Sequence, residues 1–231
     1  MQGMYKLAVI LAAGLCLSGC ATAPGNNDPY EATNRGIFRL NQRIDRMALR
    51  PTAERYSNYV PEGVRDAVHN AIDNFNAPVT LANDVLQARP RRAGETVCRF
   101  VLNSTFGAAG LFDVGTRVGI PGHTEDFGQT LAVWGVGEGP YLMLPFLGPS
   151  SPRDAFGQAA DLAAEPTIYI RIKHHTYWIM GRKYLSFVDT RARSLEVLDD
   201  IERDSLDFYA STRSLYRQYR ENEIRNGMPP P

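Results

Sequence analysis

The chain has 231 residues, with 25 basic and 25 acidic side chains, so its formal net charge at neutral pH is zero. A balanced charge argues against nucleic-acid binding, which needs a surplus of Lys and Arg on one face. Its three cysteines are too few for a disulfide framework, so packing has to hold the fold together.

The first nineteen residues, 1–19, have the layout of a secretory signal peptide. Lys6 is their one charged side chain, and residues 7–17 form an unbroken apolar run. As a helix that run reaches roughly 16 Å, well short of a ~30 Å hydrocarbon layer, so a permanent span is not expected. It ends in Leu17-Ser18-Gly19-Cys20, which is similar to the lipobox of bacterial lipoproteins. We expect cleavage before Cys20, lipid on its thiol and a short linker over residues 20–27. An ordinary signal peptide with a chance cysteine is the alternative.

Two helices are predicted next. The first begins at Asp28, whose side chain can cap free backbone amides, and is expected to end at Pro51. The second opens at Pro61 and is expected to break at Pro78, because proline lacks the N–H that a helix interior needs. A short helix to about Gln87 follows.

A helical pattern from Gly94 leads into an unusual segment. Residues 100–149 carry only five charged side chains and ten of the chain's twenty glycines. Ten glycines disfavour one long helix, since each costs about 1 kcal/mol relative to alanine. So little charge disfavours a solvated loop. We therefore predict short apolar helices joined by glycine turns and largely shielded from water.

The C-terminal part is rich in charge. A helix is expected over residues 154–164 and ends at Pro166, whereas residues 167–172 and 177–187 are compatible with helix or strand. Residues 194–225 are predicted to form one solvated helical arm with a narrow apolar stripe. Strand signals are weak throughout, so the predicted fold class is mainly α.

Several segments match, in order, one known family. They are Asp28-Pro29-Tyr30-Glu31 with Asn34-Arg35 and Asn41, Asn74-Phe75 with Pro78, Asn83-Asp84-Val85-Leu86-Gln87, Arg99-Phe100, Asn103-Ser104-Thr105, Gly110-Leu111-Phe112-Asp113, Asp126-Phe127-Gly128-Gln129-Thr130-Leu131, Trp134-Gly135-Val136-Gly137-Glu138-Gly139-Pro140-Tyr141, Leu144-Pro145-Phe146-Leu147-Gly148-Pro149-Ser150-Ser151 and Arg153-Asp154. Over residues 28–165 the chain therefore resembles the MlaA family, also called VacJ.

The resemblance implies a single ring-like helical domain over residues 28–190, lying in the inner leaflet of the outer membrane around an amphipathic channel. Residues 191–231 would be an amphipathic C-terminal helix and tail. It implies an outer-membrane lipoprotein, facing the periplasm, that removes phospholipids mislocalised to the outer leaflet and so maintains lipid asymmetry. The expected partners are phospholipid, a periplasmic carrier resembling MlaC and a trimeric porin. No enzymatic activity, metal or cofactor is expected beyond the covalent lipid on Cys20.

Two sets of residues are candidates for contact with lipid. An apolar stretch flanked by glycines could line a channel or move as a hinge, and a buried core strand or helix is the alternative. Its members are Gly135, Gly137, Gly139, Tyr141, Leu142, Met143, Leu144, Pro145, Phe146, Leu147 and Gly148. Arg89, Arg91 and Arg92 are candidate headgroup contacts, because arginine binds phosphate in a bidentate manner. A solvated helix end is the alternative there.

Other functions leave weaker signals. A phospholipase needs an activated nucleophile, and the sequence has no GxSxG motif. The glycines at 135, 137 and 139 do not have nucleotide-binding spacing. Asp113, Glu125 and Asp126 either line a wet channel or cap helices, and His123 beside the last two is a poor metal site. A passive lipid-anchored or porin-associated protein stays open as an alternative.

Overall fold

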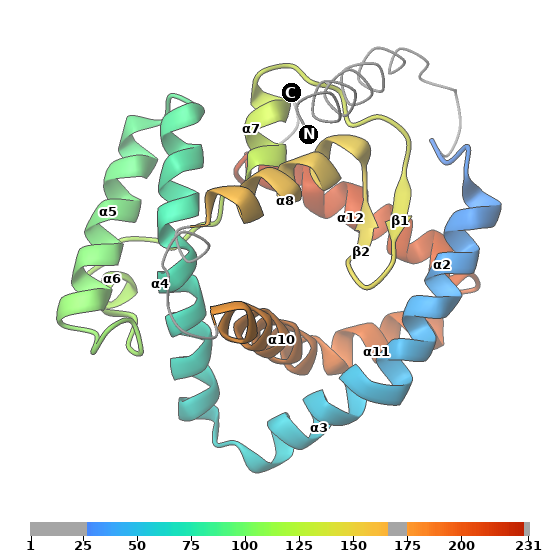
Figure 1. The fold of residues 1–231 in the computed structure, drawn as a ribbon, viewed down its shortest axis with the longest axis horizontal. Helices are drawn as coiled ribbons and strands as arrows, with labels where there is room; N and C mark the ends of the chain where they lie inside the picture. The colour runs from blue at the N-terminus through green and yellow to red at the C-terminus, as the bar shows by residue number, and fades with distance from the viewer. Residues whose placement is uncertain (1–26, 166–174, 229–231) are drawn as a thin grey trace.

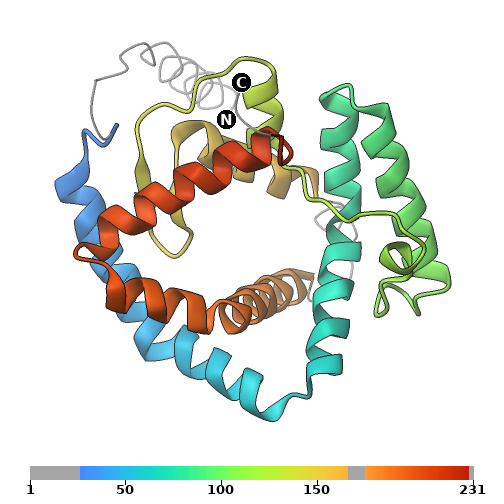
Figure 2. The same ribbon diagram turned by 180° about the vertical axis from the view of Figure 1, so that it is seen from behind.

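A computed structural model describes residues 27–165 and 175–228. The predicted signal peptide, Cys20 and Pro166 lie outside these ranges. The described helices form a ring (Figure 1). Along the ring the chain first forms α2 (Glu31–Ile44), a π-helical turn η1 (Asp45–Leu49), α3 (Arg50–Tyr59) and α4 (Glu62–Leu86). Three later helices return along it, α10 (His175–Arg193), α11 (Leu195–Asp204) and α12 (Phe208–Ile224), and Figure 2 shows α12 crossing the back of the molecule.

The remaining elements lie beside and above this ring. Helices α5 (Pro90–Thr105) and α6 (Val114–Arg117) form a lobe outside α4. Helices α7 (Phe127–Val133) and α8 (Pro152–Ala164) pack together, and an antiparallel hairpin of β1 (Leu142–Leu144) and β2 (Gly148–Ser150) lies between them in sequence. The expectation of a mainly α, ring-like domain is confirmed. In the described ranges no helix is both long and apolar enough to cross a membrane.

Neither of the two predicted proline breaks occurs. The chain stays helical from Glu31 to Tyr59, because the wider turn η1 precedes Pro51 and leaves that proline in the first turn of α3. Helix α4 runs through Pro78 to Leu86. There α5 packs along α4, and these contacts outweigh the roughly 3 kcal/mol cost of an interior proline.

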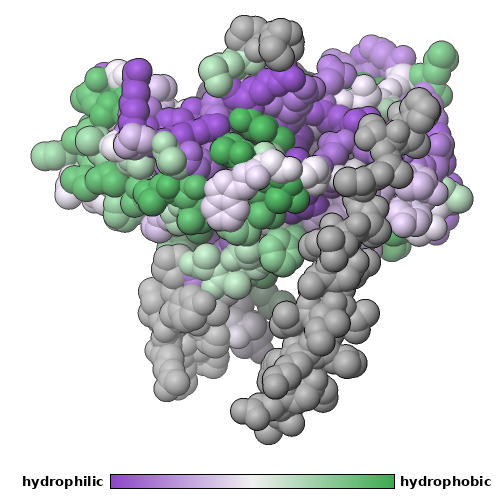
Figure 3. All heavy atoms as spheres, turned by 90° about the horizontal axis from the view of Figure 1, so that it is seen from above, coloured by the Kyte–Doolittle hydropathy of each residue, from purple (hydrophilic) through white to green (hydrophobic). Residues whose placement is uncertain are grey.

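The glycine-rich segment agrees with its prediction in part. It contains the short helices α6 and α7 joined by turns, but it ends in the β-hairpin rather than in another helix. The expectation that the segment is shielded from water is wrong for the chain by itself, since Phe106 and Val118 are 78% and 58% exposed. Figure 3 shows hydrophobic residues gathered at the left, where Figure 1 places α5 and α6. Any shielding must therefore come from the surroundings.

The C-terminal arm differs from its prediction. Residues 177–187 belong to helix α10, and residues 194–225 form the two helices α11 and α12 instead of one. The side chain of Asp207 caps α12 by accepting a hydrogen bond from Ala210 N at 3.2 Å. Tyr209, Arg213 and Arg220 of α12 are buried, so this helix is a wall of the domain and not a solvated arm.

The interior of the described residues is unusually polar. Nineteen polar or charged side chains are buried, against seven hydrophobic ones, while large apolar side chains cover much of the outside. Soluble proteins show the opposite distribution, and large exposed apolar patches mark surfaces that meet a membrane or a partner. The distribution of side chains therefore indicates that the apolar outside meets a membrane or a partner.

Candidate functional site

The predicted channel or hinge segment forms the hairpin. Leu142 pairs with Ser150 and Leu144 with Gly148, so Pro145, Phe146 and Leu147 form the tip, all exposed. Phe146 has a φ of 65° and Gly148 a φ of 84°, and a backbone with positive φ strains any residue with a Cβ. The tip thus places two large apolar side chains on the surface in a tight turn.

Two asparagines of α2 hold the hairpin. Asn34 donates to Tyr141 O at 3.0 Å and accepts from Met143 N at 2.9 Å. Asn41 donates to Leu144 O at 2.8 Å and accepts from Phe146 N at 2.9 Å. Seven residues are about two turns of helix, so both side chains lie on one face of α2. The two side-chain amides make hydrogen bonds to the backbone of the hairpin that a neighbouring strand would otherwise make. The hairpin is therefore bound to a helix in the way that it would be bound to a sheet.

The base of the hairpin is held by aromatic and charged contacts. Tyr141 and Met143 are almost fully buried, and the Tyr141 ring packs edge-on against Tyr209 of α12. Asp28 accepts hydrogen bonds from the Tyr209 hydroxyl, from Asn34 Nδ2 at 2.8 Å and from Arg213 Nη1 at 2.8 Å. Burial and the bond to Asp28 raise the pKa of Tyr209, which stays protonated.

The role predicted for Asp28 was therefore wrong. The N-cap residue of α2 is Tyr30, and no side chain bonds there. Asp28 instead connects the start of the domain to α12, because its carboxylate is completely buried and a buried charge needs a paired partner. Arg213 supplies that partner.

The glycines before the hairpin lie where the chain enters it. Gly135 and Gly139 have φ values of 90° and 75°, while Gly137 is exposed with open space around it. Asn27 bonds to this entry, since its side chain donates to Gly139 O at 2.8 Å and its carbonyl accepts from Tyr141 N at 2.9 Å. The chain that leads back toward Cys20 is thus attached directly to the hairpin base.

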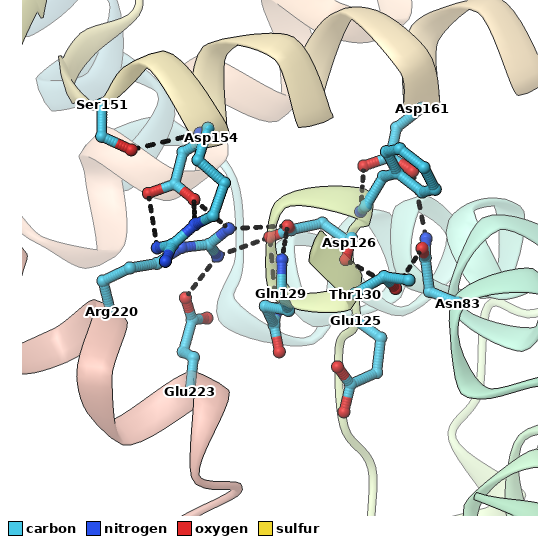
Figure 4. A network of polar contacts seen from close by, with 12 residues as sticks. Asn83, Glu125, Asp126, Gln129, Thr130, Ser151, Asp154, Asp161, Arg220 and Glu223 are labelled. Carbon is cyan, nitrogen blue, oxygen red and sulfur yellow. Dashed lines mark hydrogen bonds and ion pairs between the residues drawn. The ribbon is translucent and has the colours of Figure 1, made fainter. Parts of the chain in front are cut away.

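A polar network closes the ring between α7, α8 and α12 (Figure 4). Arg220 donates to both oxygens of Asp126, at 2.6 and 2.7 Å, and to Asp154 at 3.0 Å. Burial alone would raise the pKa of these carboxyls, but the bonds and charge of Arg220 bring both below the usual range. Asp126 also caps α7 through Gln129 N at 2.9 Å, which confirms one of the two alternatives for this acid.

The other two acids of the glycine-rich segment also have structural partners. Asp113 caps α6 by accepting from Thr116 N at 3.1 Å. Glu125 is buried and accepts from Gln87 Nε2 at 2.8 Å, and burial raises its pKa. His123 bonds to Asp84 at 3.1 Å. Within residues 27–165 and 175–228 no three His, Cys, Asp or Glu side chains are placed to hold a metal ion.

The three arginines predicted to contact headgroups lie at the start of α5 and in the turn before it. Arg92 Nη2 is 3.1 Å from Glu125 Oε1, and Arg89 Nη1 is 3.5 Å from the same oxygen. Arg91 pairs with Glu95 at 3.1 Å and has a side chain that is 91% exposed. Arg89 and Arg92 share the carboxylate of Glu125, and Arg92 also lies 3.8 Å from Asp84, so Arg91 is the most open of the three to an external phosphate. Headgroup contact here stays a prediction.

An amphipathic cavity of about 250 Å³ lies where the hairpin, α2 and α11 meet. One part of its wall is apolar and is formed by Phe38, Met143, Leu198 and Phe208. Another part is charged and is formed by Asp45, Arg46, Arg191 and Glu202. Sequence reasoning assigned no function to these charged residues, because they come from η1, α10 and α11, which are far apart along the chain.

The most useful missed signal is the spacing of paired residue types. Asn34 and Asn41 on α2, and Arg213 and Arg220 on α12, each stand seven residues apart and so share a helix face. Both pairs make the contacts that position the hairpin and close the ring. The spacing was visible in the sequence, but the partner segments were not.

Comparison with known proteins gives a consistent result. The model of the family "MlaA lipoprotein" matches residues 26–223. The "Intermembrane phospholipid transport system lipoprotein MlaA" of Escherichia coli K12 is 33% identical over 232 residues, which cover 96% of this chain and 89% of that protein. An uncharacterized protein of Rickettsia bellii is 36% identical over 199 residues, covering 86% of this chain and 77% of that protein.

The fold is similar to a solved structure as well. A chain reported under "Structural basis for maintenance of bacterial outer membrane lipid asymmetry" superposes with a TM-score of 0.75 at 32% sequence identity. The match covers 85% of this chain and 98% of that chain, so almost the whole of the solved fold has a counterpart here.

Proposed function

Because the chain belongs to the MlaA lipoprotein family, we propose that it removes phospholipids mislocalised to the outer leaflet of the outer membrane. In this proposal it passes them to a periplasmic carrier resembling MlaC and so maintains lipid asymmetry. The anchor is lipid on Cys20, and the ring lies in the inner leaflet facing the periplasm.

The observation that carries this proposal is the inverted distribution of side chains. Polar and charged groups are buried between the described helices, and apolar groups cover much of the outside. The apolar exterior is compatible with acyl chains, and polar groups in a protein that lies in a membrane often mark a path for polar ligands. The wall of the cavity beside the hairpin contains both apolar and charged residues. An amphiphile is the ligand class that fits such a wall.

The hairpin is the part of the molecule that we propose borders the lipid path. Its tip exposes Phe146 and Leu147, while its base is buried against α12. The attachment of Asn27 to Tyr141 and Gly139 would keep the hairpin near the lipid anchor. Asn27 lies seven positions after Cys20, a reach of at most roughly 25 Å.

The proposed partners follow from the same surfaces. The apolar lobe of α5 and α6 would contact lipid or a trimeric porin, because an exposed apolar patch of this kind needs a cover. Transport is favoured over hydrolysis, since the named relatives are transport system lipoproteins.

The test measures outer-leaflet phospholipid in cells lacking the protein, in cells restored with the wild type, and in cells restored with Cys20→Ala. We expect excess surface phospholipid without the protein and rescue by the wild type, with no release of fatty acid or lysolipid. Release of either product would favour a phospholipase. An unchanged outer leaflet would favour a passive structural protein and would contradict the proposal.

A further inference from the structure

We propose that the amphipathic cavity beside the hairpin binds the headgroup of a zwitterionic phospholipid, with its phosphate on Arg46 and its ammonium on Glu202. The inference rests on the proposed transport function and adds the headgroup class and its contacts. It depends on three features of the cavity: the charges of its wall, the exposure of its ion pairs and its apolar end.

The charged wall of the cavity consists of two ion pairs. Arg191 donates to both oxygens of Asp45, at 2.9 and 3.1 Å, and its side chain is only 10% exposed. Arg46 Nη2 donates to Glu202 Oε1, and these side chains are 59% and 33% exposed. We call the first the floor pair and the second the rim pair. The side chains of Arg191 and Asp45 are 10% and 27% exposed, so the floor pair is less open to incoming groups than the rim pair.

The charges of the two pairs cancel. With two acids and two bases in the wall, the cavity has no surplus positive charge, so it has no electrostatic reason to prefer an anionic headgroup. A zwitterion brings one charge of each sign and leaves the site neutral. An anionic headgroup would leave one uncompensated negative charge near Glu202 and Asp45, which is unfavourable.

The two residues of the rim pair can give up their contact with each other and bind a ligand instead. An exposed ion pair contributes little to stability, so Arg46 and Glu202 can separate at small cost. Each then finds an opposite charge on the ligand, the guanidinium on the phosphate and the carboxylate on the ammonium. The floor pair stays closed, because Arg191 is only 10% exposed and would have to give up hydrogen bonds to both oxygens of Asp45.

The apolar end explains why a lipid fits better than a free phosphate ester. Phe38 and Phe208 pack edge-to-face with their centroids 5.4 Å apart, and Met143 and Leu198 complete this end. Glycerol and the first methylenes of the acyl chains would bury apolar surface here. Met143 belongs to β1 of the hairpin, so occupancy of the cavity and the position of the hairpin are linked.

The experiment uses the full-length lipidated protein in mixed micelles with equal amounts of phosphatidylethanolamine and phosphatidylglycerol. Native mass spectrometry measures the ratio of the two lipids bound. We expect the wild type to favour phosphatidylethanolamine. Glu202→Gln leaves the cavity with one extra positive charge and should shift the ratio toward phosphatidylglycerol roughly two- to fivefold. Arg46→Gln should shift it the opposite way.

Two matched variants serve as controls. The double reversal Arg46→Glu with Glu202→Arg keeps a neutral rim pair and should restore the wild-type ratio. Arg203→Gln removes an exposed arginine of the same helix as Glu202 that pairs with Asp200 and Asp204 and does not line the cavity. It should leave the ratio unchanged, and an equal shift there would mean that general surface charge sets the preference.

The possible failures can be told apart. Bound lipid that mirrors the micelle in the wild type and all variants would overturn the headgroup inference and leave transport untouched. Glycerophosphoethanolamine, which lacks acyl chains, binding as tightly as the lipid would overturn the role of the apolar end. Failure of transport itself would appear as a normal outer leaflet in cells lacking the protein.

Discussion

The contact between Asn41 and the hairpin can be tested directly. Asn41→Ala removes two hydrogen bonds, those to Leu144 O and from Phe146 N. Each is worth about 0.5–1.5 kcal/mol, so the variant should destabilise the attached hairpin by about 1–3 kcal/mol. Tenfold in an equilibrium corresponds to about 1.4 kcal/mol, and the detached population should therefore rise roughly 5- to 150-fold.

Amide hydrogen exchange measures that population, since exchange reports local opening. Met143 is the informative amide, because it is bonded to Asn34 and loses no bond in the variant. If the hairpin detaches as one unit, we expect the exchange of the Met143 amide to accelerate roughly 5- to 150-fold. Asn41→Asp is the matched control, because it keeps the acceptor for Phe146 N–H and should give a smaller increase.

The result that would refute this reasoning is faster exchange at Phe146 together with unchanged exchange at Met143. The tip would then open alone, and Asn34 by itself would hold the hairpin base. Unchanged exchange at both amides would mean that the burial of Tyr141 and Met143, and not the asparagine contacts, attaches the hairpin to α2.

Three further predictions concern the ring closure and the hairpin turn. Arg220→Met should cost about 3–5 kcal/mol of stability at pH 7. Of its three carboxylate partners, Asp126 and Asp154 have a lowered pKa in the folded protein. The wild type therefore loses their contribution as pH falls below about 4, and thermal unfolding should show a smaller difference at pH 3. Gly157→Ala should lower the melting temperature, because its Cβ would lie 2.3 Å from Gly128 N, whereas Gly94→Ala, with open space, should not. Gly148→Val should impair lipid transfer through backbone strain yet leave the protein in the membrane fraction; normal lipid asymmetry would contradict a role for this turn.

The fold class could be predicted because its signals are local. Helical spacing and the near absence of strand patterns depend on residues within a few turns of each other. The predicted breaks at the two prolines were wrong because other parts of the structure accommodate these residues. Pro51 is accommodated by the π-helical turn, and α4 continues through Pro78 because α5 packs along it. The compensation for Pro78 comes from α5, which begins twelve residues further along the chain.

In the candidate site too, local features could be predicted from the sequence and contacts between distant residues could not. The glycine-flanked segment was recognisable from its composition, and it does form the exposed hairpin. Its attachment to α2 joins residues more than a hundred positions apart. The headgroup prediction at Arg89 and Arg92 could not foresee the buried carboxylate of Glu125 beside them.

The sequence by itself determined the mainly helical fold, the family resemblance and the apolar glycine-rich segment, since each depends on residues close together in the chain. The lipoprotein signal stays a prediction, because it lies outside the described residues. The tertiary structure alone decided which charges neutralise one another. Arg46 meets Glu202, and Arg220 meets Asp126 and Asp154, only after the ring has closed. Arg220 is buried and needs a paired charge, and Arg46 meets a residue 156 positions away. The partners of both arginines are therefore set by the closed fold and not by their neighbours in sequence.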